Sequence, residues 1–534
     1  MAGKKVAVIG AGSSGLVAIK CCLDEGLSPV CFERSADIGG LWNFRPEGKE
    51  DGQATVMKST IINTSKEMMC WSDFPIPKEY PNYMHNTYVM KYFRLFVDKF
   101  DLTKYIKFQH EIVLIKQAPC SEETGQWEVK VKDIGQDQEH TYVFDAVLVC
   151  TGHHARKYEP TFPGQEEFQG KIIHSHDYRD HKGYEDKRVV VVGVGNSGND
   201  VASELGRISQ RVFLATRRGT WIFNRVGENG LPGDVIASRR LTRMIFSLLP
   251  FNMLCSMIES KVNARFDHEK YGLKPKHRIM SAHPSVNDDL PNRILSGGVV
   301  VKPNIRRFTK TGVEFEDGTM EDNIDAVILA TGYIFGFPFI DEKVIKVEKN
   351  VADLYKYMWP LTTDHPTLAV IGYIQPLGAI FPIAELQCRW ATRVFKGLCM
   401  LPSKEDMKTD ILRKRHAMAK RYVPSQRHTI QVDYVPYMDE LADQVGCKPD
   451  ILKLFLTDPR LALEVLTGPC TPCQYRLCGP GQWAGAREAV LTTMDRVYYP
   501  LNTRKCDESR RDTGMMKLLV AMVLIIAVIF KLFF

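Results

Sequence analysis

The stretch that decides the fold of this 534-residue chain is Gly10-Ala11-Gly12-Ser13-Ser14-Gly15. It follows an apolar run from Lys4, typical of a strand, and opens an apolar helix that reaches Leu23. In this spacing the first glycine makes a tight turn, the second lets backbone approach a pyrophosphate, and the third lets the helix pack on the strand. The helix N-terminus then faces the phosphates. We therefore expect a dinucleotide to bind here, in contact with Gly10, Ala11, Gly12, Ser13, Ser14 and Gly15.

The next predicted strand indicates which dinucleotide binds. It runs from Pro29 to Glu33, and a carboxylate at its end accepts hydrogen bonds from ribose hydroxyls and disfavours a 2′-phosphate. Just beyond it, Gly39-Gly40-Leu41-Trp42 continues the pattern of FAD-binding proteins, in which this loop runs along the flavin. We expect FAD at this first unit, with Glu33, Leu41 and Trp42 in contact with it.

A second copy of the fingerprint follows the four valines Val189 to Val192. Its partner strand ends in Thr216-Arg217-Arg218 rather than in a carboxylate, and paired guanidiniums with a hydroxyl suit a 2′-phosphate. The alternative is that the two arginines are only a solvated pair. We expect NADPH at this unit, in contact with Gly193, Gly195, Asn196, Ser197, Gly198, Asn199, Asp200, Thr216, Arg217 and Arg218.

Two similar strands indicate how the units are connected. Residues 145–152 and 325–332 each form an apolar run that ends in Thr-Gly, and we interpret them as exits from the first unit into the second and back. This predicts an α/β fold with two Rossmann-like domains, the NADPH domain inserted into the FAD domain, followed by a C-terminal helical region and a membrane-anchoring helix. The expected boundaries are 1–163 and 300–510 for the FAD domain with the helical region, 164–299 for the inserted domain and 511–534 for the anchor.

Composition excludes some classes of function. The chain is 44% hydrophobic and 25% charged, as in ordinary globular proteins, and its net charge of +7 is too small for a nucleic-acid binder. The sequence leaves open whether the protein forms a homo-oligomer. The cysteines are scattered, which suits a reducing compartment, and their one cluster, Cys470, Cys473 and Cys478, lacks a second ligand pair at zinc-finger spacing. We therefore expect no bound metal.

The end of the chain has the composition of a membrane anchor. Residues 518–530 form an unbroken apolar run, and 515–534 approach the roughly 20 residues that span a bilayer. Basic side chains precede the run, and the N-terminal apolar run is too short for a secretory signal. We expect a body in the cytosol held on a membrane by this tail. The alternative is a hydrophobic helix docked on the protein's own core.

Several motifs resemble those of one enzyme family. The spacing Phe168-x-Gly170-x-x-x-His174-x-x-x-Tyr178 resembles the identifying sequence of flavin-containing monooxygenases, and 63–69, 330–333 and 375–378 also look like that family. The apolar tail resembles that of its microsomal vertebrate members, which implies the endoplasmic reticulum membrane as location. Among these members the likeness is greatest to the isoform-five branch, through residues 273–278, 287–293 and 426–430.

The resemblance implies a reaction cycle and further site residues. NADPH reduces FAD, NADP⁺ stays bound, and dioxygen adds to the flavin as a C4a-hydroperoxide that a dry, hydrogen-bonded pocket must protect. Asn63 is the implied catalytic amide, because a neutral amide donates and accepts hydrogen bonds without releasing a proton. His174 and Tyr178 are interpreted as a linker device that fixes the pose of the two domains. Further implied cofactor contacts are Ile62, Thr64, Thr331, Gly332 and Gln375.

One position bears on the type of oxygenation. His283 stands in Ser281-Ala282-His283-Pro284, where most vertebrate members carry glutamate. A glutamate would disfavour an anionic oxidant, whereas a histidine is neutral or positive and can polarise a carbonyl, so we assign His283 a catalytic role. We expect Baeyer-Villiger oxidation of small lipophilic xenobiotic ketones to esters. The alternatives are oxygenation of amines and sulfides, a leaky NADPH oxidase that releases hydrogen peroxide, and an exposed loop histidine without a role.

Overall fold

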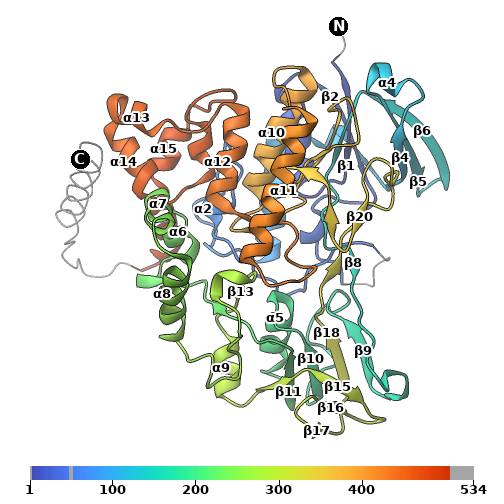
Figure 1. The fold of residues 1–534 in the computed structure, drawn as a ribbon, viewed down its shortest axis with the longest axis vertical. Helices are drawn as coiled ribbons and strands as arrows, with labels where there is room; N and C mark the ends of the chain where they lie inside the picture. The colour runs from blue at the N-terminus through green and yellow to red at the C-terminus, as the bar shows by residue number, and fades with distance from the viewer. Residues whose placement is uncertain (1–2, 47–51, 505–534) are drawn as a thin grey trace.

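The computed structural model describes residues 3–46 and 52–504. Its core consists of two separate sheets of parallel strands, one above the other along the long axis of the molecule (Figure 1). The first sheet has the strand order β24-β7-β1-β2-β3. All its neighbouring strands are parallel, and its core positions are buried because helices cover one face and an antiparallel sheet packs against the other. Its strands are β1 Lys5–Ile9, β2 Ser28–Glu33, β3 Ile106–Phe108, β7 Ala146–Val149 and β24 Leu368–Val370.

The second sheet repeats this plan in the order β14-β11-β10-β18-β9, again with parallel neighbours. Its strands are β9 Lys171–His174, β10 Arg188–Val192, β11 Arg211–Thr216, β14 Val299–Pro303 and β18 Ala326–Leu329. The two sheets confirm the predicted pair of Rossmann-like units. The second sheet extends to Leu329, past the boundary expected near residue 299, because a small antiparallel excursion, β15 Ile305–Phe308, β16 Val313–Phe315 and β17 Met320–Glu321, separates its last two strands.

The chain crosses between the two units on neighbouring strands. β8 Arg156–Lys157 leaves the first unit and pairs antiparallel with β19 Tyr333–Ile334, which returns to it. His174 Nε2 donates to the Gly332 carbonyl oxygen at 3.1 Å, and Thr331 Oγ1 donates to the Tyr158 carbonyl oxygen at 2.5 Å. The His174 end of the motif at 168–178 therefore braces the return crossing.

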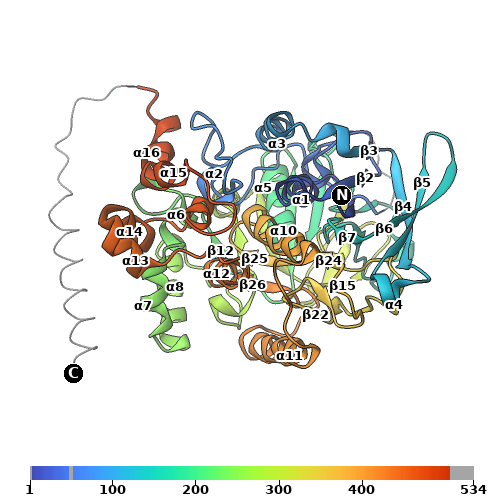
Figure 2. The same ribbon diagram turned by 90° about the horizontal axis from the view of Figure 1, so that it is seen from above.

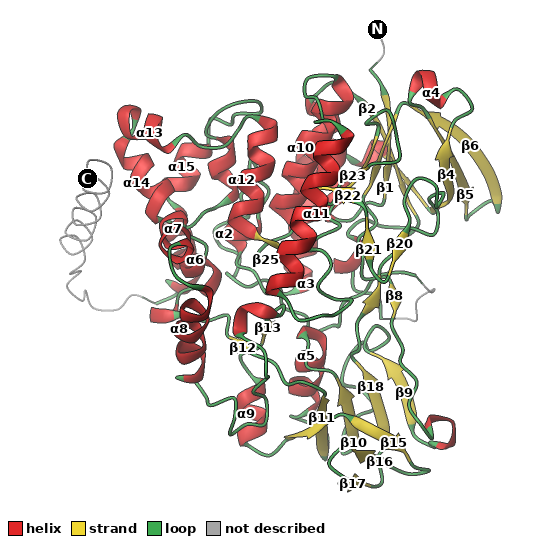
Figure 3. Ribbon diagram, viewed as in Figure 1, coloured by secondary structure: helices red, strands yellow, loops and turns green. Residues whose placement is uncertain are grey.

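Helices gather on one side of the molecule and the strands of both sheets on the other (Figure 3). α1 Ser13–Asp24 packs between the first sheet and α10 Phe381–Lys396, and both helices are almost completely buried. Residues 386–466 are mostly helical, as expected. The longer helices here are α11 Lys404–Arg421, α12 Tyr434–Val445, α13 Ile451–Thr457 and α14 Pro459–Thr467, followed by α15 Ala486–Leu491 and α16 Thr493–Tyr498.

Smaller elements complete the two units. An antiparallel sheet of β4 His110–Gln117, β5 Trp127–Asp133 and β6 Gln138–Phe144 flanks the first unit, and the short strands β12 Ile222–Phe223 and β13 Ser285–Val286 pair in the second. The loop Gln426–Gln431 reaches β25 Gln375–Leu377 through β26 Gln431–Asp433. The other helices are α2 Lys66–Met69, α3 Asn86–Phe100, α4 Ser121–Thr124, α5 Asn196–Leu205, α6 Gly233–Ala237, α7 Arg240–Ser247, α8 Phe251–Asn263 and α9 Leu290–Leu295.

Helices from the middle and from the C-terminal part of the chain form one flank. α7 and α8 of the inserted unit lie beside α13 and α14 in both views (Figures 1 and 2), and α7 contacts α14. No helix in residues 3–46 and 52–504 is long and apolar enough to cross a membrane. The anchor expected at 511–534 lies outside the described residues.

Candidate cofactor and active site

The first glycine loop has the geometry that phosphate binding requires. β1 ends at Ile9, and Gly10 turns the chain with a φ of +95°, in the left-handed region that glycine tolerates. A Cβ on Gly15 would lie 1.8 Å from the Gly10 carbonyl oxygen, so only glycine permits α1 to start this close to β1. A Cβ on Gly12 would meet nothing nearer than 3.8 Å, which leaves room for a ligand at the start of the helix.

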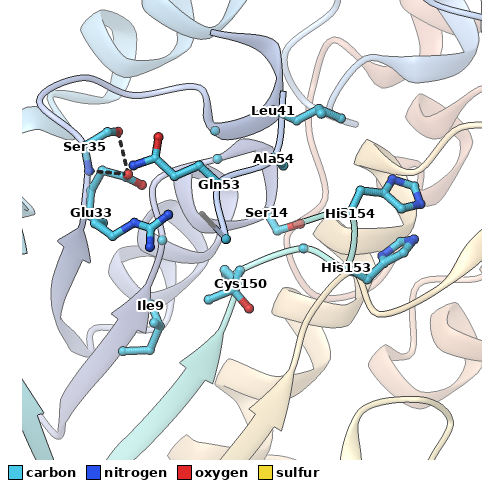
Figure 4. A pocket seen from close by; sticks show the side chains of 18 of the residues that line it. Ile9, Ser14, Glu33, Ser35, Leu41, Gln53, Ala54, Cys150, His153 and His154 are labelled. Carbon is cyan, nitrogen blue, oxygen red and sulfur yellow. Dashed lines mark hydrogen bonds between the residues drawn. The ribbon is translucent and has the colours of Figure 1, made fainter. Parts of the chain in front are cut away.

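Glu33 is held rigidly at the end of β2. Its Oε2 accepts from the Ala11 backbone N–H at 2.7 Å, and its Oε1 accepts from the backbone N–H and Oγ of Ser35 at 2.8 and 2.6 Å. Figure 4 shows the pair of bonds to Ser35. Because a carboxylate oxygen has more than one lone pair, Glu33 can still accept from a ribose hydroxyl.

A cavity of about 760 Å³ opens beside this loop (Figure 4). Its volume and its glycine-rich floor at the start of α1 suit a bound dinucleotide. Seven of the predicted residues line it: Gly10, Gly12, Ser13, Ser14, Glu33, Leu41 and Trp42. Sequence reasoning missed several further polar lining residues: Arg34, Arg45, Gln53, His153, His154 and Arg156. Ile62, Asn63, Thr64, Thr331, Gly332 and Gln375 do not line this cavity.

His153 and His154 enter the cavity from the loop after β7. His153 is buried, and neither ring nitrogen has a hydrogen-bond partner among the described residues. Burial lowers the pKa of His154 to about 4, with a smaller contribution from the positive charge of Arg427, and burial also holds the pKa of His153 well below its usual range. Both side chains are therefore neutral at physiological pH. The only feature of the sequence that could have indicated His153 and His154 is their position directly after Thr151-Gly152, where the chain leaves the first unit.

The second glycine loop copies the first. A Cβ on Gly198 would lie 1.9 Å from the Gly193 carbonyl oxygen, so α5 starts as close to β10 as α1 does to β1. Two predicted contacts are occupied by the protein itself. Asn196 Oδ1 accepts from the Val286 backbone N–H at 2.8 Å, and the fully buried Asn199 donates to the Val194 carbonyl oxygen at 3.3 Å. These side chains shape the loop.

Positive charge collects beside this loop. Thr216 ends β11, and its Oγ1 accepts from the Gly219 backbone N–H at 3.0 Å, while Arg217 and Arg218 follow and are exposed. In the described part of the chain, neither arginine forms an ion pair with a carboxylate. Burial, and then the charge of Arg218, lower the pKa of His277. An anion would compensate this charge, which favours the phosphate interpretation over a solvated pair.

Asn63 links the two units. Its Oδ1 accepts from Arg225 Nη2 at 2.7 Å, and Arg225 Nη1 lies 3.2 Å from Asp288 Oδ2. Asn63 is half-buried, and because this bond occupies its amide oxygen, the other end of the amide is the nitrogen, which donates hydrogen bonds. Asp200 lies near this group: its Oδ1 accepts from Asn287 Nδ2 at 2.8 Å, and burial raises its pKa to about 6.

His283 is a half-buried residue in a hydrogen-bonded cluster, so the interpretation as an exposed loop histidine is wrong. Its Nδ1 lies 2.9 Å from Gln431 Oε1, and its backbone N–H donates to His428 Nε2 at 3.2 Å. Gln431 Nε2 donates in turn to Gln375 Oε1 at 2.7 Å, so Gln375 supports His283 rather than the cavity. Burial lowers the pKa of His283 to about 4 despite the bond to Gln431. The sequence leaves open whether this imidazole is neutral or positively charged, and the lowered pKa makes it neutral at pH 7.

Comparison with known proteins places this fold and site in a family. The family model for flavin-binding monooxygenase-like proteins matches residues 3–533. The chain belongs to this family, and it is an oxidoreductase that uses FAD, NADPH and dioxygen.

The similarity extends over whole chains. The chain is 55% identical to Flavin-containing monooxygenase 5 of Mus musculus over 99% of its own length and 98% of that protein, and 55% identical to the Homo sapiens protein of the same name over 97% and 96%. It is 48% identical to Dimethylaniline monooxygenase [N-oxide-forming] 2 of Cavia porcellus over 98% of both. The likeness to the isoform-five branch is thus confirmed.

Two solved structures share the fold. S-allyl-L-cysteine S-oxygenase from Allium sativum matches with a TM-score of 0.62 at 23% identity over 85% of this chain and 92% of that one. Cyclohexanone monooxygenase from Rhodococcus, bound to NADP⁺, matches with a TM-score of 0.60 at 17% identity over 83% and 97%.

Proposed function

We propose that this enzyme holds FAD at the first glycine loop and NADPH at the second, and inserts one oxygen atom of dioxygen into small lipophilic ketones to give esters. The second oxygen atom leaves as water, and NADPH supplies the two electrons. The observation that supports ketones most directly is the state of His283: a neutral imidazole, fixed by Gln431, at the position where the family resemblance implies a glutamate in most vertebrate members.

The residues of the chain divide the work. FAD, when bound, accepts hydride from NADPH and activates dioxygen. Glu33 holds the ribose side of the first site, and Arg217 with Arg218 neutralises the 2′-phosphate at the second. Asn63, whose oxygen is occupied by Arg225, presents its N–H groups as donors that release no proton. His283 adds no negative charge beside the oxidant, so an anionic oxidant that attacks carbonyl carbon is not disfavoured there.

A second reaction is oxygenation of amines and sulfides. The 48% identical relative named for N-oxide formation favours it. An uncoupled enzyme that releases hydrogen peroxide is a third outcome.

One experiment separates the three. The holoenzyme is supplied with NADPH and air, together with an acyclic ketone in one sample and an alkyl sulfide in another, and ester, sulfoxide and hydrogen peroxide are measured per NADPH consumed. Ester as the main product supports the proposal. Sulfoxide without ester supports heteroatom oxygenation, and peroxide equal to the NADPH consumed would exclude a coupled oxygenase.

We also propose that the enzyme sits on the endoplasmic reticulum membrane with its body in the cytosol. The apolar sequence 515–534 supports this, and so does the flank formed by α7, α8 and α13. Leu248 is 72% exposed and Leu456 is 87% exposed, and large apolar side chains in such numbers suit a lipid surface. The exposed apolar residues of this flank are Met244, Ile245, Leu248, Phe251, Met253, Met257, Leu452 and Leu456.

A further inference from the structure

The loop Gln426–Gln431 belongs to the first unit by sequence but reaches the second nucleotide site. Its backbone is held from several directions around Arg427. Ser425 Oγ accepts from the Arg427 N–H at 3.2 Å, Gln431 Nε2 donates to the Arg427 carbonyl oxygen at 3.3 Å, and Asn350 Nδ2 donates to the Gln426 carbonyl oxygen at 3.1 Å. These bonds fix the backbone from which the Arg427 side chain extends.

The Arg427 guanidinium lies over the second glycine loop. A Cβ on Gly195 would be 3.1 Å from Arg427 Nη2 and 3.5 Å from Nη1. Gly195 is the middle glycine of the fingerprint, the position at which backbone approaches a pyrophosphate. The guanidinium thus occupies the side of the loop on which the diphosphate of a dinucleotide runs.

The charge of Arg427 is uncompensated. In the described part of the chain, no carboxylate forms an ion pair with it, and the residue is exposed to solvent while its guanidinium lies against the Gly195 loop. Burial by the surrounding chain, and then the positive charge of Arg217, lower the pKa of Arg427. An anionic group at this place would relieve the repulsion.

We propose that Arg427 binds the diphosphate of NADPH against the Gly195 loop, so that the second nucleotide site is completed by the first unit. The proposal rests on NADPH occupying this loop, as set out above. A guanidinium can donate two parallel bonds to phosphate oxygens, which a lysine cannot reproduce.

This arrangement connects the nucleotide to the catalytic histidine. The neighbours of Arg427 in the loop, His428 and Gln431, make the two hydrogen bonds that fix His283. A diphosphate that holds Arg427 therefore also holds the support of His283 in place.

The test compares NADP⁺ and NAD⁺, since both carry the diphosphate and only one carries the 2′-phosphate. Dissociation constants of both are measured by calorimetry on the FAD-loaded full-length protein, without turnover. Arg427→Ala should weaken both nucleotides by the same factor, between about tenfold and about a hundredfold, because bonds to charged groups contribute to that extent. The dissociation constants of Arg427→Lys should lie between those of the wild type and those of Arg427→Ala.

Two further variants make the result specific. Arg217→Ala with Arg218→Ala should weaken NADP⁺ alone, and Arg306→Ala, an exposed arginine of β15 paired with Glu314, should change neither constant. Flavin content and melting temperature check that each variant is folded. A loss of NADP⁺ binding alone in Arg427→Ala would assign Arg427 to the 2′-phosphate and overturn the proposal, and so would unchanged binding of both. A wild type that binds no NADP⁺ would instead overturn the proposed function.

Discussion

His283 and Gln431 form a hydrogen bond of 2.9 Å that joins the inserted unit to the first one. The Gln431 side chain is oriented by its own bond to Gln375, so its oxygen faces His283 and the proton of the imidazole resides on Nδ1. The opposite nitrogen, Nε2, keeps its lone pair. The histidine that the sequence distinguishes is therefore a neutral group of fixed tautomer.

Replacing His283 by glutamate should shift the enzyme from ketones to sulfides. The added negative charge disfavours a deprotonated oxidant, and one pKa unit corresponds to about 1.4 kcal/mol, or roughly tenfold in the minor protonation state. Initial rates of ester and sulfoxide formation are measured for His283→Glu, with His283→Gln as the neutral control. If ester and sulfoxide formation change by the same factor in His283→Glu, the residue affects folding or gating, and other residues set the preference for ketones over sulfides.

The glycine loop of the first site allows a paired test of FAD binding. Gly15→Ala should both unfold the unit and abolish flavin retention, because its Cβ would lie 1.8 Å from the Gly10 oxygen. Gly12→Ala has open space in the protein, with 3.8 Å to the nearest atom, and should leave the fold intact while it excludes the diphosphate. Flavin absorbance per polypeptide and the melting temperature are recorded for both. A yellow Gly12→Ala protein would contradict the placement of FAD at this loop.

Two buried histidines should make the protein sensitive to mild acid. Burial lowers the pKa of His174 and of His268 to about 4 each, and both are fully buried. The unfolded pKa is about 6.5, so the unfolded chain binds more protons between pH 6.5 and 4. The stability contributed is complete above pH 6.5 and is lost as the pH falls towards 4.

The measurement is the melting temperature at pH 7 and pH 5. The drop should be smaller in His268→Gln than in the wild type, since each histidine contributes on the order of 2 kcal/mol to this loss. His140→Gln, on the exposed face of β6, is the matched control and should lose as much as the wild type. Equal drops in all three proteins would show that other groups govern acid sensitivity.

Removing residues 515–534 should move the protein from the membrane fraction to the soluble fraction with its flavin content unchanged. The sequence of this segment is the most apolar part of the chain, and both nucleotide sites lie outside it. Fractionation is repeated with the truncated protein carrying Leu248→Glu and Met253→Glu on the exposed flank. If the truncated protein still pellets and the two substitutions release it, the flank alone is sufficient for membrane binding.

The sequence predicts the parts of the site that depend on local order. Gly10 to Gly15 and Glu33 are close in the chain, and their strand-turn-helix context determines where they lie. The same is true of the second loop, so two sheets and their ligand-facing edges could be predicted.

The rest of the site depends on contacts between distant segments. Arg427 reaches Gly195 and Gln431 reaches His283 only because the chain returns from the second unit and folds back, and no local pattern encodes that geometry. Asn199 is a predicted cofactor contact, and its side chain also holds the loop backbone through the Val194 carbonyl oxygen, a bond that the fingerprint spacing does not predict. The domain boundary predicted near residue 299 precedes β18 of the second sheet, because the β15–β17 excursion interrupts the strand pattern.

The pairing of β8 with β19 means that the chain enters and leaves the second unit at one point. A segment with adjacent ends can be exchanged as a block with little cost in loop closure, and domain insertion is tolerated at such places. Exchanging this unit between relatives would then also transfer the proposed preference for NADPH, because Arg217 and Arg218 lie within the exchanged segment. Arg427 does not travel with it, so a chimera between relatives would have to match the grafted loop to a guanidinium supplied by its host.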